Sequence, residues 1–341
     1  MFKLAKPVFL ICETPLHAGS GSELGVVDLP IQRERHTDFP KIESSSLKGG
    51  IREAFEKPRD TSASKILQVG KEQITPFKQD PSHKKYEDSV LLTFGPEESG
   101  NDNYAGALGF TDARLLLFSV KSMKGVFAWI TCPKVLQRFA TDLTLCEDSA
   151  LTVPPLPEAE TVPYNCSLFV KDDKIVLEEY TFSITKDEMD QGNCSKLAEW
   201  LSNHLFPAAK ADNDPYTYWR EKLKIDLVVL KDDDFRDFVT LSTEVVTRIR
   251  IEPATGTVAK GALFTEEFLP SESVMYSLVL ASPIFRKDED KKDSIFVQNG
   301  THEETLVMQF FEQGLPEVIQ LGGDATIGKG IIRTHIMKKE S

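Results

Sequence analysis

The two ends of the chain constrain the fold most, because each combines a strand-like run with a helix-like run. Residues 7–14 have the pattern of a buried strand, and residues 44–55 place apolar side chains at helical spacing behind a row of serines. At the other end, residues 303–313 have the pattern of a helix and residues 331–337 that of a strand. Such runs favour an antiparallel α+β sheet assembled from both ends of the chain.

A glycine-rich segment accompanies each end, at residues 17–25 and at residues 321–330. We expect the two segments to lie side by side and to form one polar surface. The second segment matches a phosphate-binding P-loop except that Gly330 replaces the Ser or Thr that would hold magnesium. A β-branched, alternating run follows it where a P-loop needs a helix, which argues against nucleotide hydrolysis. Two interpretations stay open: backbone N–H groups that hold a phosphodiester, or a tight hairpin whose glycines only supply positive φ angles.

Between the ends, strand and helix patterns alternate without a repeat of fixed period. Residues 58–104 are polar and rich in Lys, Asp, Ser and Gly, which indicates a mobile loop. The other predictions are strands at 106–120, 125–132, 223–230, 237–251 and 274–280, a hairpin over 168–185 that turns at 171–174, and helices at 134–146 and 196–206.

The charge of the chain argues against binding nucleic acid, because its formal net charge is −13 and phosphate binding normally leaves a basic surface. The distribution of charge weakens this argument. Residues 1–60 are balanced and residues 320–341 have a small basic excess, so the acidity lies between them. An acidic outer surface beside a local basic groove is compatible with RNA binding but does not predict it.

Cysteine usage and hydropathy indicate a cytoplasmic protein. The five cysteines are widely spaced and form no CxxC pair, which argues against a disulfide framework or a zinc knuckle. No apolar run approaches the ~20 residues that span a bilayer, and the first apolar run fits a strand better than a signal peptide.

Several motifs together resemble one protein family. The motifs are His17–Gly21, Gly25–His36 with its block Asp28-Leu-Pro-Ile-Gln-Arg-Glu-Arg-His36, Phe39–Ile42, Ser44–Arg52, Leu115–Trp129, Glu266–Pro270 and Leu321–Gly330. They resemble the RAMP superfamily and, more narrowly, the repeated backbone subunits of type III-B (Cmr) CRISPR effector complexes. The likeness extends over nearly the whole chain.

This resemblance implies a fold. It implies a ferredoxin-like (RRM-like) antiparallel palm from residues 1–57 and 215–341, with a projecting β-hairpin thumb at about residues 252–275. It also implies an inserted helical and strand region at residues 58–214, which includes the mobile loop.

The resemblance also implies a function. Copies of such subunits stack head to tail along a guide crRNA, beside other Cmr subunits, and each copy cuts the paired target RNA next to a displaced nucleotide. The implied cofactor is a divalent cation, Mg²⁺ or Mn²⁺, and no membrane is involved. Two alternatives remain: a guide-binding scaffold without catalysis, and a stand-alone ribonuclease that processes repeat RNA.

Four residues are candidates for catalysis. The resemblance ties Asp28 to cutting, and we favour metal coordination or positioning of a hydroxyl over proton abstraction, because an ordinary Asp has a pKa of ~3.9; its alternative role is that of a turn residue. His17 is either a general acid or a hydrogen-bonded loop histidine. Glu266 and Glu267 face opposite ways on a strand, so at most one points at the scissile phosphate and we expect the other to be solvated. Phe268 and Leu269 are candidates for a wedge against a base.

The candidates for RNA binding gather in the two end segments. Lys48, near the start of a helix that we expect to be capped by serine, would hold the guide backbone. Gln32 could reach a base or a 2′-hydroxyl. The remaining candidates are Arg33, Arg35, Arg52, Gly323, Gly328, Lys329, Gly330 and Arg333.

Overall fold

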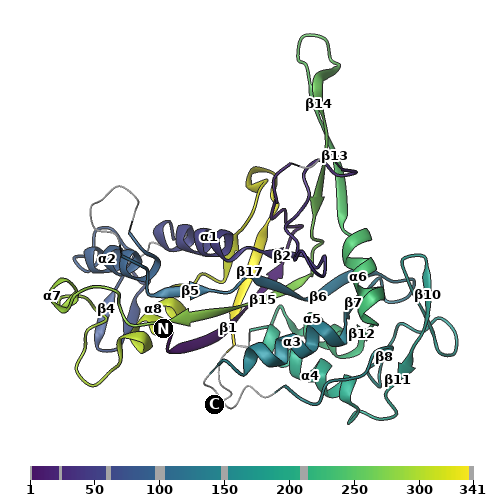
Figure 1. The fold of residues 1–341 in the computed structure, drawn as a ribbon, viewed down its shortest axis with the longest axis horizontal. Coiled ribbons are helices and arrows are strands. Elements are labelled where there is room, and N and C mark those ends of the chain that lie inside the picture. Colours follow the sequence, from purple (N-terminus) through teal and green to yellow (C-terminus); the bar gives the residue numbers. More distant parts are fainter. Residues whose placement is uncertain are drawn as a thin grey trace.

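A large mixed sheet forms the centre of the computed structural model, which describes residues 2–22, 25–58, 63–96, 104–146, 153–207 and 214–337 (Figure 1). The strands are β1 Leu4–Cys12, β2 Lys41–Ile42, β3 Leu67–Val69, β4 Glu72–Ile74, β5 Leu108–Phe110, β6 Ala113–Lys121, β7 Phe127–Thr131, β8 Thr161–Val162, β9 Lys174–Leu177, β10 Tyr180–Ser183, β11 Thr185–Lys186, β12 Leu227–Val229, β13 Glu244–Ile251, β14 Val258–Phe268, β15 Val274–Ala281, β16 Val318–Gln320 and β17 Ile331–Ile336. The helices are α1 Ser44–Glu56, α2 His83–Phe94, α3 Pro133–Leu143, α4 Asn193–Leu205, α5 Thr217–Ile225, α6 Asp232–Leu241, α7 Asp288–Lys291, α8 Glu303–Gly314 and the 3₁₀ turn η1 Ala325–Ile327.

Strand β1 lies inside the central sheet between two strands from the other end of the chain. It pairs antiparallel with β15 on one side and with β17 on the other. The described strands follow the order β11-β8-β12-β7-β6-β15-β1-β17-β16, with β2 beside β6 and β5 beside β15. The predicted assembly of the sheet from both ends of the chain is therefore confirmed.

The predicted antiparallel pairing holds for the central strands, but the far edge of the sheet also contains parallel pairs. Strand β12 runs parallel to β7, and β11 runs parallel to β8. Helices α3, α4 and α5 lie between β7 and β12 in the sequence, and a crossover of that length returns the chain in the parallel direction. The structure is a mixed α+β fold.

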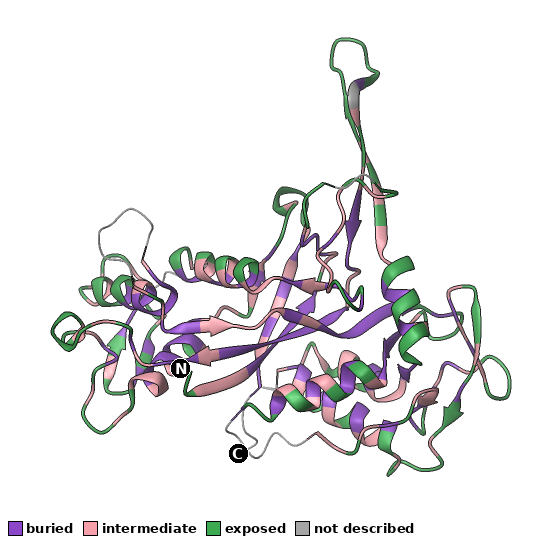
Figure 2. Ribbon diagram, viewed as in Figure 1, coloured by how far each residue is buried: buried purple, intermediate pink, exposed green. Residues whose placement is uncertain are grey.

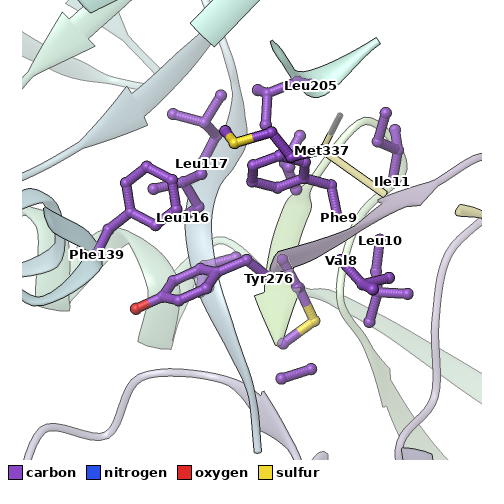
Figure 3. Close-up of a cluster of buried hydrophobic side chains, with 14 of the residues drawn as sticks. Val8, Phe9, Leu10, Ile11, Leu116, Leu117, Phe139, Leu205, Tyr276 and Met337 are labelled. Atoms are coloured by element: carbon purple, nitrogen blue, oxygen red, sulfur yellow. The ribbon is translucent and has the colours of Figure 1, made fainter. Parts of the chain in front are cut away.

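Aromatic side chains fill the space between the central sheet and the inserted helices. Phe139 of α3 packs edge to face on Tyr276 of β15, with ring centroids 4.8 Å apart, and lies 6.1 Å from the ring of Phe9. Figure 3 shows Phe9 beside Met337 and Leu205 in this cluster. Because alternate residues of a strand face opposite sides, the other face of the sheet packs against α1 and α8, where the Phe55 and Phe311 rings stack.

Three local predictions differ from the structure. The region predicted as a mobile loop contains β3, β4 and α2, because Phe94 packs on Phe55 of α1 and Tyr86 lies beside Phe310 of α8; its residues 59–62 and 97–103 lie outside the described residues. The run 237–251 divides into α6 and β13, because Phe235, Phe238 and Val239 form a buried helical stripe. The hairpin predicted over 168–185 is formed by β9 and β10, but it turns at residues 178–179 and not at 171–174.

A two-stranded hairpin, β13–β14, projects from the body of the molecule (Figure 1). Its strands pair from Glu244 with Phe268 at the root to Ile251 with Val258 near the tip, with a register shift between Ile249 and Ile251. The thumb hairpin was predicted at about residues 252–275. In the structure its first strand already begins at Glu244 and its second ends at Phe268, and Val274 onward belongs to β15 in the central sheet. Figure 2 shows the outer half of the hairpin mainly as exposed.

The turn between β6 and β7 holds a valine in an unfavourable backbone conformation. Val126 has φ +73° and is 82% exposed, although a β-branched residue rarely adopts positive φ. Buried Lys222 donates from Nζ to Gly125 O at 3.0 Å and to Asp226 Oδ2 at 2.6 Å. The neighbouring N–H of Met123 donates to Val176 O. These contacts hold the turn and maintain the strained conformation.

Candidate nucleic-acid interface

The two glycine-rich segments lie side by side, as predicted. Gly330 N donates to Pro15 O and Gly323 N donates to His17 O, both at 2.9 Å. Gly322 and Gly330 have φ angles of +73° and +69°, and a Cβ on either would meet a backbone carbonyl oxygen, that of His17 or that of Leu321. Only glycine fits at these two positions. Gly322 was not among the predicted site residues.

The glycine loop runs from β16 through η1 to β17. A strand follows it and not a helix, which confirms that the segment is not a P-loop. Gly328 has φ +77° and is exposed, with open space where a Cβ would be. The Nζ of Lys329 lies over the Phe268 ring at 4.8 Å from its centroid, so this ammonium stays beside the loop.

Arg333 lies away from the glycine loop. Its Nε donates to Glu13 Oε1, and its guanidinium lies 5.1 Å from the Tyr216 ring centroid, on the side of the inserted helices. The structure therefore does not bring Arg333 together with Lys329, because residues 329 and 333 are separated by the start of β17.

Asp28 is an exposed carboxylate that is fixed to the root of the hairpin. Its Oδ2 accepts hydrogen bonds from Thr265 N at 2.7 Å and from Thr265 Oγ1 at 2.9 Å, while Asp28 N donates to the same hydroxyl at 3.0 Å. These hydrogen bonds, the backbone one first, lower the pKa of Asp28 below its ordinary value. The carboxylate is therefore ionised and oriented at neutral pH. Thr265 was not predicted.

Glu267 is a buried structural anchor. Its Oε1 pairs with Arg33 and accepts from Thr243 Oγ1 at 2.7 Å, and its Oε2 accepts from Ile31 N at 3.0 Å. Arg33 also donates to the backbone carbonyls of Asp38 and Val239. Glu267 and Arg33 thus attach the segment that joins β1 to α1 (the front segment) to the hairpin. The geometry gives neither side chain a direct role in binding RNA.

Glu266 points the other way, into a cluster with His17. His17 Nδ1 donates to Glu267 O at 2.7 Å, and its Nε2 lies 3.7 Å from Glu266 Oε1. Burial, then the nearby Asp324 carboxylate, raises the pKa of Glu266. The opposite orientation of the two glutamates is confirmed, but the expectation that one is solvated is wrong: both are buried. His17 occupies the position of a hydrogen-bonded loop histidine, which was one of its two interpretations.

Phe268 and Leu269 are buried at the hairpin root, with exposures of 0% and 2%. The prediction that they wedge against a base is corrected, because Phe268 packs on His17 and Leu269 pairs with Leu16 through backbone hydrogen bonds. The hairpin instead exposes aliphatic side chains beyond Thr265. These are Ile249, Ile251, Val258 and Leu263.

In helix α1, the groups that were expected to bind RNA already have partners within the protein. Lys48 Nζ donates to Leu108 O at 2.9 Å, and burial, then the charge of Arg52, lowers its pKa. Arg52 pairs with Glu56. The expected serine cap is absent: in this described helix the N-cap is Glu43, and the Asp112 carboxylate accepts from Ser44 N at 2.9 Å. This carboxylate occupies the helix N-terminus, where a phosphate was expected to bind.

Gln32 and Arg35 differ in their freedom. Gln32 Nε2 donates to Gly19 O and its Oε1 accepts from Glu43 N, so its amide holds the front segment together. Arg35 is exposed, and no ion-pair partner for it is found among the residues that the structure describes. Of the predicted side chains, the structure brings His17, Glu266 and Lys329 around Phe268, and leaves Lys48, Arg52 and Arg333 outside this group.

Neither a metal centre nor a membrane segment is evident in the described part of the chain. There, no three His, Cys, Asp or Glu side chains gather as metal ligands. One carboxylate held by a threonine is not a complete donor set for an octahedral ion such as Mg²⁺, so these residues do not form a resident metal site. None of the described helices has the length and apolar character needed to cross a bilayer.

Comparison with known proteins finds similarity over nearly the whole chain. The model of the RAMP superfamily matches residues 9–333. The chain is 35% identical over 325 residues to the CRISPR system Cmr endoribonuclease Cmr4 of Pyrococcus furiosus, with 95% of this chain and 92% of that protein covered. It is 26% identical over 337 residues to the CMR subunit Cmr4 of Saccharolobus solfataricus, with coverages of 97% and 96%.

Solved structures are similar over the same extent. A crystal structure of oligomeric Cmr4 from Pyrococcus furiosus has a TM-score of 0.65 and 28% identity, with 99% of this chain and 100% of that chain covered. A cryo-EM structure of the type III-B Cmr-beta complex bound to cognate target RNA has a chain of the same fold, with a TM-score of 0.63, 20% identity and 98% coverage of both chains.

Proposed function

Because the chain belongs to the RAMP superfamily, in the group of Cmr4 backbone subunits of type III-B CRISPR complexes, we propose that it holds a guide RNA and cuts the target RNA paired with it. In this proposal, copies of the chain stack head to tail along the guide, together with other Cmr subunits. The observation that carries the proposal is the fixed, ionised Asp28 at the root of a projecting hairpin.

The order of the central strands supports a ferredoxin-like palm. In chain order, β1, α1, β6, β15, α8 and β17 form a β-α-β-β-α-β series, and the sheet order β6-β15-β1-β17 is the one that this fold requires. In the proposal these elements are the palm and the hairpin β13–β14 is the thumb. This assignment of domains differs from the expected boundaries, because β6 lies within residues 58–214, which were expected to be inserted.

The exposed face of the hairpin supports a role in displacing a nucleotide. Ile249 and Leu263 are cross-strand partners, and so are Ile251 and Val258. The pair Ile249–Leu263 lies on the face that carries Thr265, and so on the side of Asp28, whereas the pair Ile251–Val258 lies beyond the register shift. We propose that these aliphatic side chains, in place of Phe268 and Leu269, insert into the stack of bases. The displaced target nucleotide then lies near Asp28.

Cleavage by this route needs no nucleophile from the protein. The 2′-oxygen of the target attacks the adjacent phosphorus, the bond to the 5′-oxygen breaks, and a 2′,3′-cyclic phosphate and a 5′-hydroxyl result. The 2′-hydroxyl gives up its proton and the 5′-oxygen gains one. Asp28, with its lowered pKa, is a poor base but a good acceptor that orients the 2′-hydroxyl in line with the leaving oxygen. Lys329 and the glycine-loop amides are proposed to hold the sugar–phosphate strand.

The dependence on a divalent cation stays a prediction. Of the predicted catalytic residues, only Asp28 would bind this cation, and water and RNA phosphate oxygens would supply the other ligands. Such a cation would stabilise negative charge on the phosphate.

The test uses a complex reconstituted with guide RNA and a labelled complementary target. Asp28→Ala and Asp28→Asn should abolish regular cutting while the affinity for the target stays unchanged. Asp38→Asn is the matched control, because Asp38 is an exposed carboxylate of the same front segment, and this variant should cut like the wild type.

The alternatives give different outcomes in the same experiment. If the wild-type complex binds the target but does not cut it, the subunit is a scaffold. If the Asp28 variants cut normally, Asp28 has no part in cutting and the catalytic proposal is wrong. If the purified chain alone cuts repeat RNA, the chain is a stand-alone processing ribonuclease.

A further inference from the structure

One arginine bridges the hairpin and the glycine loop. Arg248 of β13 donates from Nε to Glu266 Oε2 at 3.1 Å and from Nη2 to Asp324 Oδ2 at 2.9 Å. Glu266 belongs to the same hairpin, whereas Asp324 lies in the glycine loop immediately before η1. The side chains of Arg248 and Asp324 are 27% and 28% exposed, so solvent only partly screens their ion pair.

The contact depends on Arg248 because the two carboxylates would otherwise repel each other. Burial, then the charge of the nearby Asp324 carboxylate, raises the pKa of Glu266. Lys329 Nζ lies over the Phe268 ring of the hairpin root, and His17 Nε2 lies near the other oxygen of Glu266. Of these groups, only the guanidinium contacts both carboxylates. Without it, two like charges face each other across the junction.

The backbone at Asp324 transmits its position to the rest of the loop. Asp324 has φ +62°, and its carbonyl oxygen accepts from Ile327 N at 3.1 Å and from Lys329 N at 3.2 Å. A displacement of Asp324 would therefore move η1 and the ammonium of Lys329. On the hairpin side, Arg248 occupies the face opposite to Thr265, which holds Asp28.

We propose that Arg248 and Asp324 form a latch that fixes the hairpin root against the glycine loop, and that Arg248 is thereby a positioning residue for target cleavage. The cleavage part rests on the proposed function. With the latch closed, Asp28 keeps a constant place relative to a strand held along the glycine loop. With the latch open, the hairpin tilts. Different copies of the subunit in the complex then cut at different phosphates relative to their own Asp28.

The latch is tested first in the isolated chain, by amide hydrogen exchange. Arg248→Gln should speed exchange of the Gly323 and Leu269 amides about tenfold, because local opening becomes easier. Adding Asp324→Asn should return the rate close to that of the wild type, because the repulsion between the carboxylates is gone. Arg250→Gln, two residues farther along the same strand, is the matched control and should change nothing.

The second measurement is the distribution of cut sites in the reconstituted complex. Arg248→Gln should spread the cuts over neighbouring phosphodiester bonds and slow them about tenfold. Guide and target affinity should not change, and the double variant should recover regular cutting. Arg248→Lys should restore cutting only in part, because an ammonium cannot donate to both carboxylates in the geometry of a guanidinium.

Each outcome decides one point. If the double variant cuts as poorly as Arg248→Gln, Arg248 contacts RNA directly and the latch is not its role. If Arg248→Gln leaves amide exchange unchanged, there is no latch. If the wild-type complex does not cut at all, the proposed function fails, while the exchange experiment still decides whether the latch exists.

Discussion

At the scale of single residues, the orientation of Asp28 depends on Thr265. The pair lies 237 residues apart in the sequence and makes three hydrogen bonds. The family resemblance identified Asp28, but no local pattern identifies Thr265, because only the folded hairpin brings it to the front segment. A separation of 76 residues likewise explains why Arg248 and Asp324 were missed. A non-glycine residue inside a glycine loop was the one available signal for Asp324.

Replacing Thr265 with valine should slow target cleavage about tenfold, because the carboxylate loses its hydroxyl donor and part of its orientation. Single-turnover cleavage in the reconstituted complex measures the effect. Thr247→Val is the matched control, because Thr247 is the cross-strand partner of Thr265 and does not contact Asp28. Equal rates for the two variants would contradict the role of Thr265.

The lowered pKa of Asp28 makes a prediction about stability and pH. A carboxyl whose folded-state pKa is depressed stabilises the fold above its unfolded pKa of about 4, and this contribution is lost as the pH falls through the folded-state pKa. The difference in unfolding free energy between wild type and Asp28→Asn should therefore be constant from about pH 5 to 8 and shrink below about pH 4. Urea titrations at several pH values measure it. A difference that grows on acidification would show that the sign is wrong.

At the scale of elements, the hairpin β13–β14 has buried apolar residues at its root and exposed ones farther out. Alternation along the strands could be predicted, and the opposite directions of Glu266 and Glu267 followed from it. Which residues lie at the root could not be predicted, because burial of Phe268 comes from the front segment and the glycine loop that surround it. The wedge was therefore assigned to two residues, Phe268 and Leu269, that the fold buries.

Two variants of the hairpin should affect different properties, one the stability of the fold and the other the pattern of cutting. Phe268→Ala should lower the free energy of unfolding by about 3–5 kcal/mol, because it leaves a cavity at a fully buried site. The double variant Ile249→Ser and Leu263→Ser should change stability by less than about 0.5 kcal/mol but abolish the regular spacing of cuts. Urea unfolding and sequencing of cleavage products measure the two effects. Regular cuts by the double variant would exclude these aliphatic side chains as the wedge.

At the scale of the whole molecule, the central sheet joins both ends of the chain to the inserted region. The end strands were predictable because their apolar patterns are long and clear. The inserted region was less predictable, because β8, β11 and β12 are two or three residues long and owe their pairing to the helices that cover them. The net charge of −13 lies mostly in the middle of the chain and gave no indication of the site.

The buried Lys222–Asp226 pair tests how far the inserted region contributes to overall stability. Asp226→Ala should lower the free energy of unfolding by about 3–5 kcal/mol, because Lys222 would stay buried without its partner. Thermal and urea unfolding measure the loss. Glu221→Ala is the control on the same helix, because it removes an exposed ion pair and should cost less than about 1 kcal/mol. Similar losses in both variants would contradict the importance of burial.

The strained turn at Val126 has a consequence for how the chain could be made more robust. Glycine tolerates φ +73° without the clash of a branched side chain, so Val126→Gly should raise the thermal midpoint, by the equivalent of about 1 kcal/mol. A variant that melts at a higher temperature and still cuts RNA would mean that Val126 lowers stability and is not needed for cutting. The exposed isopropyl group of Val126 would then serve a contact with a molecule outside this chain.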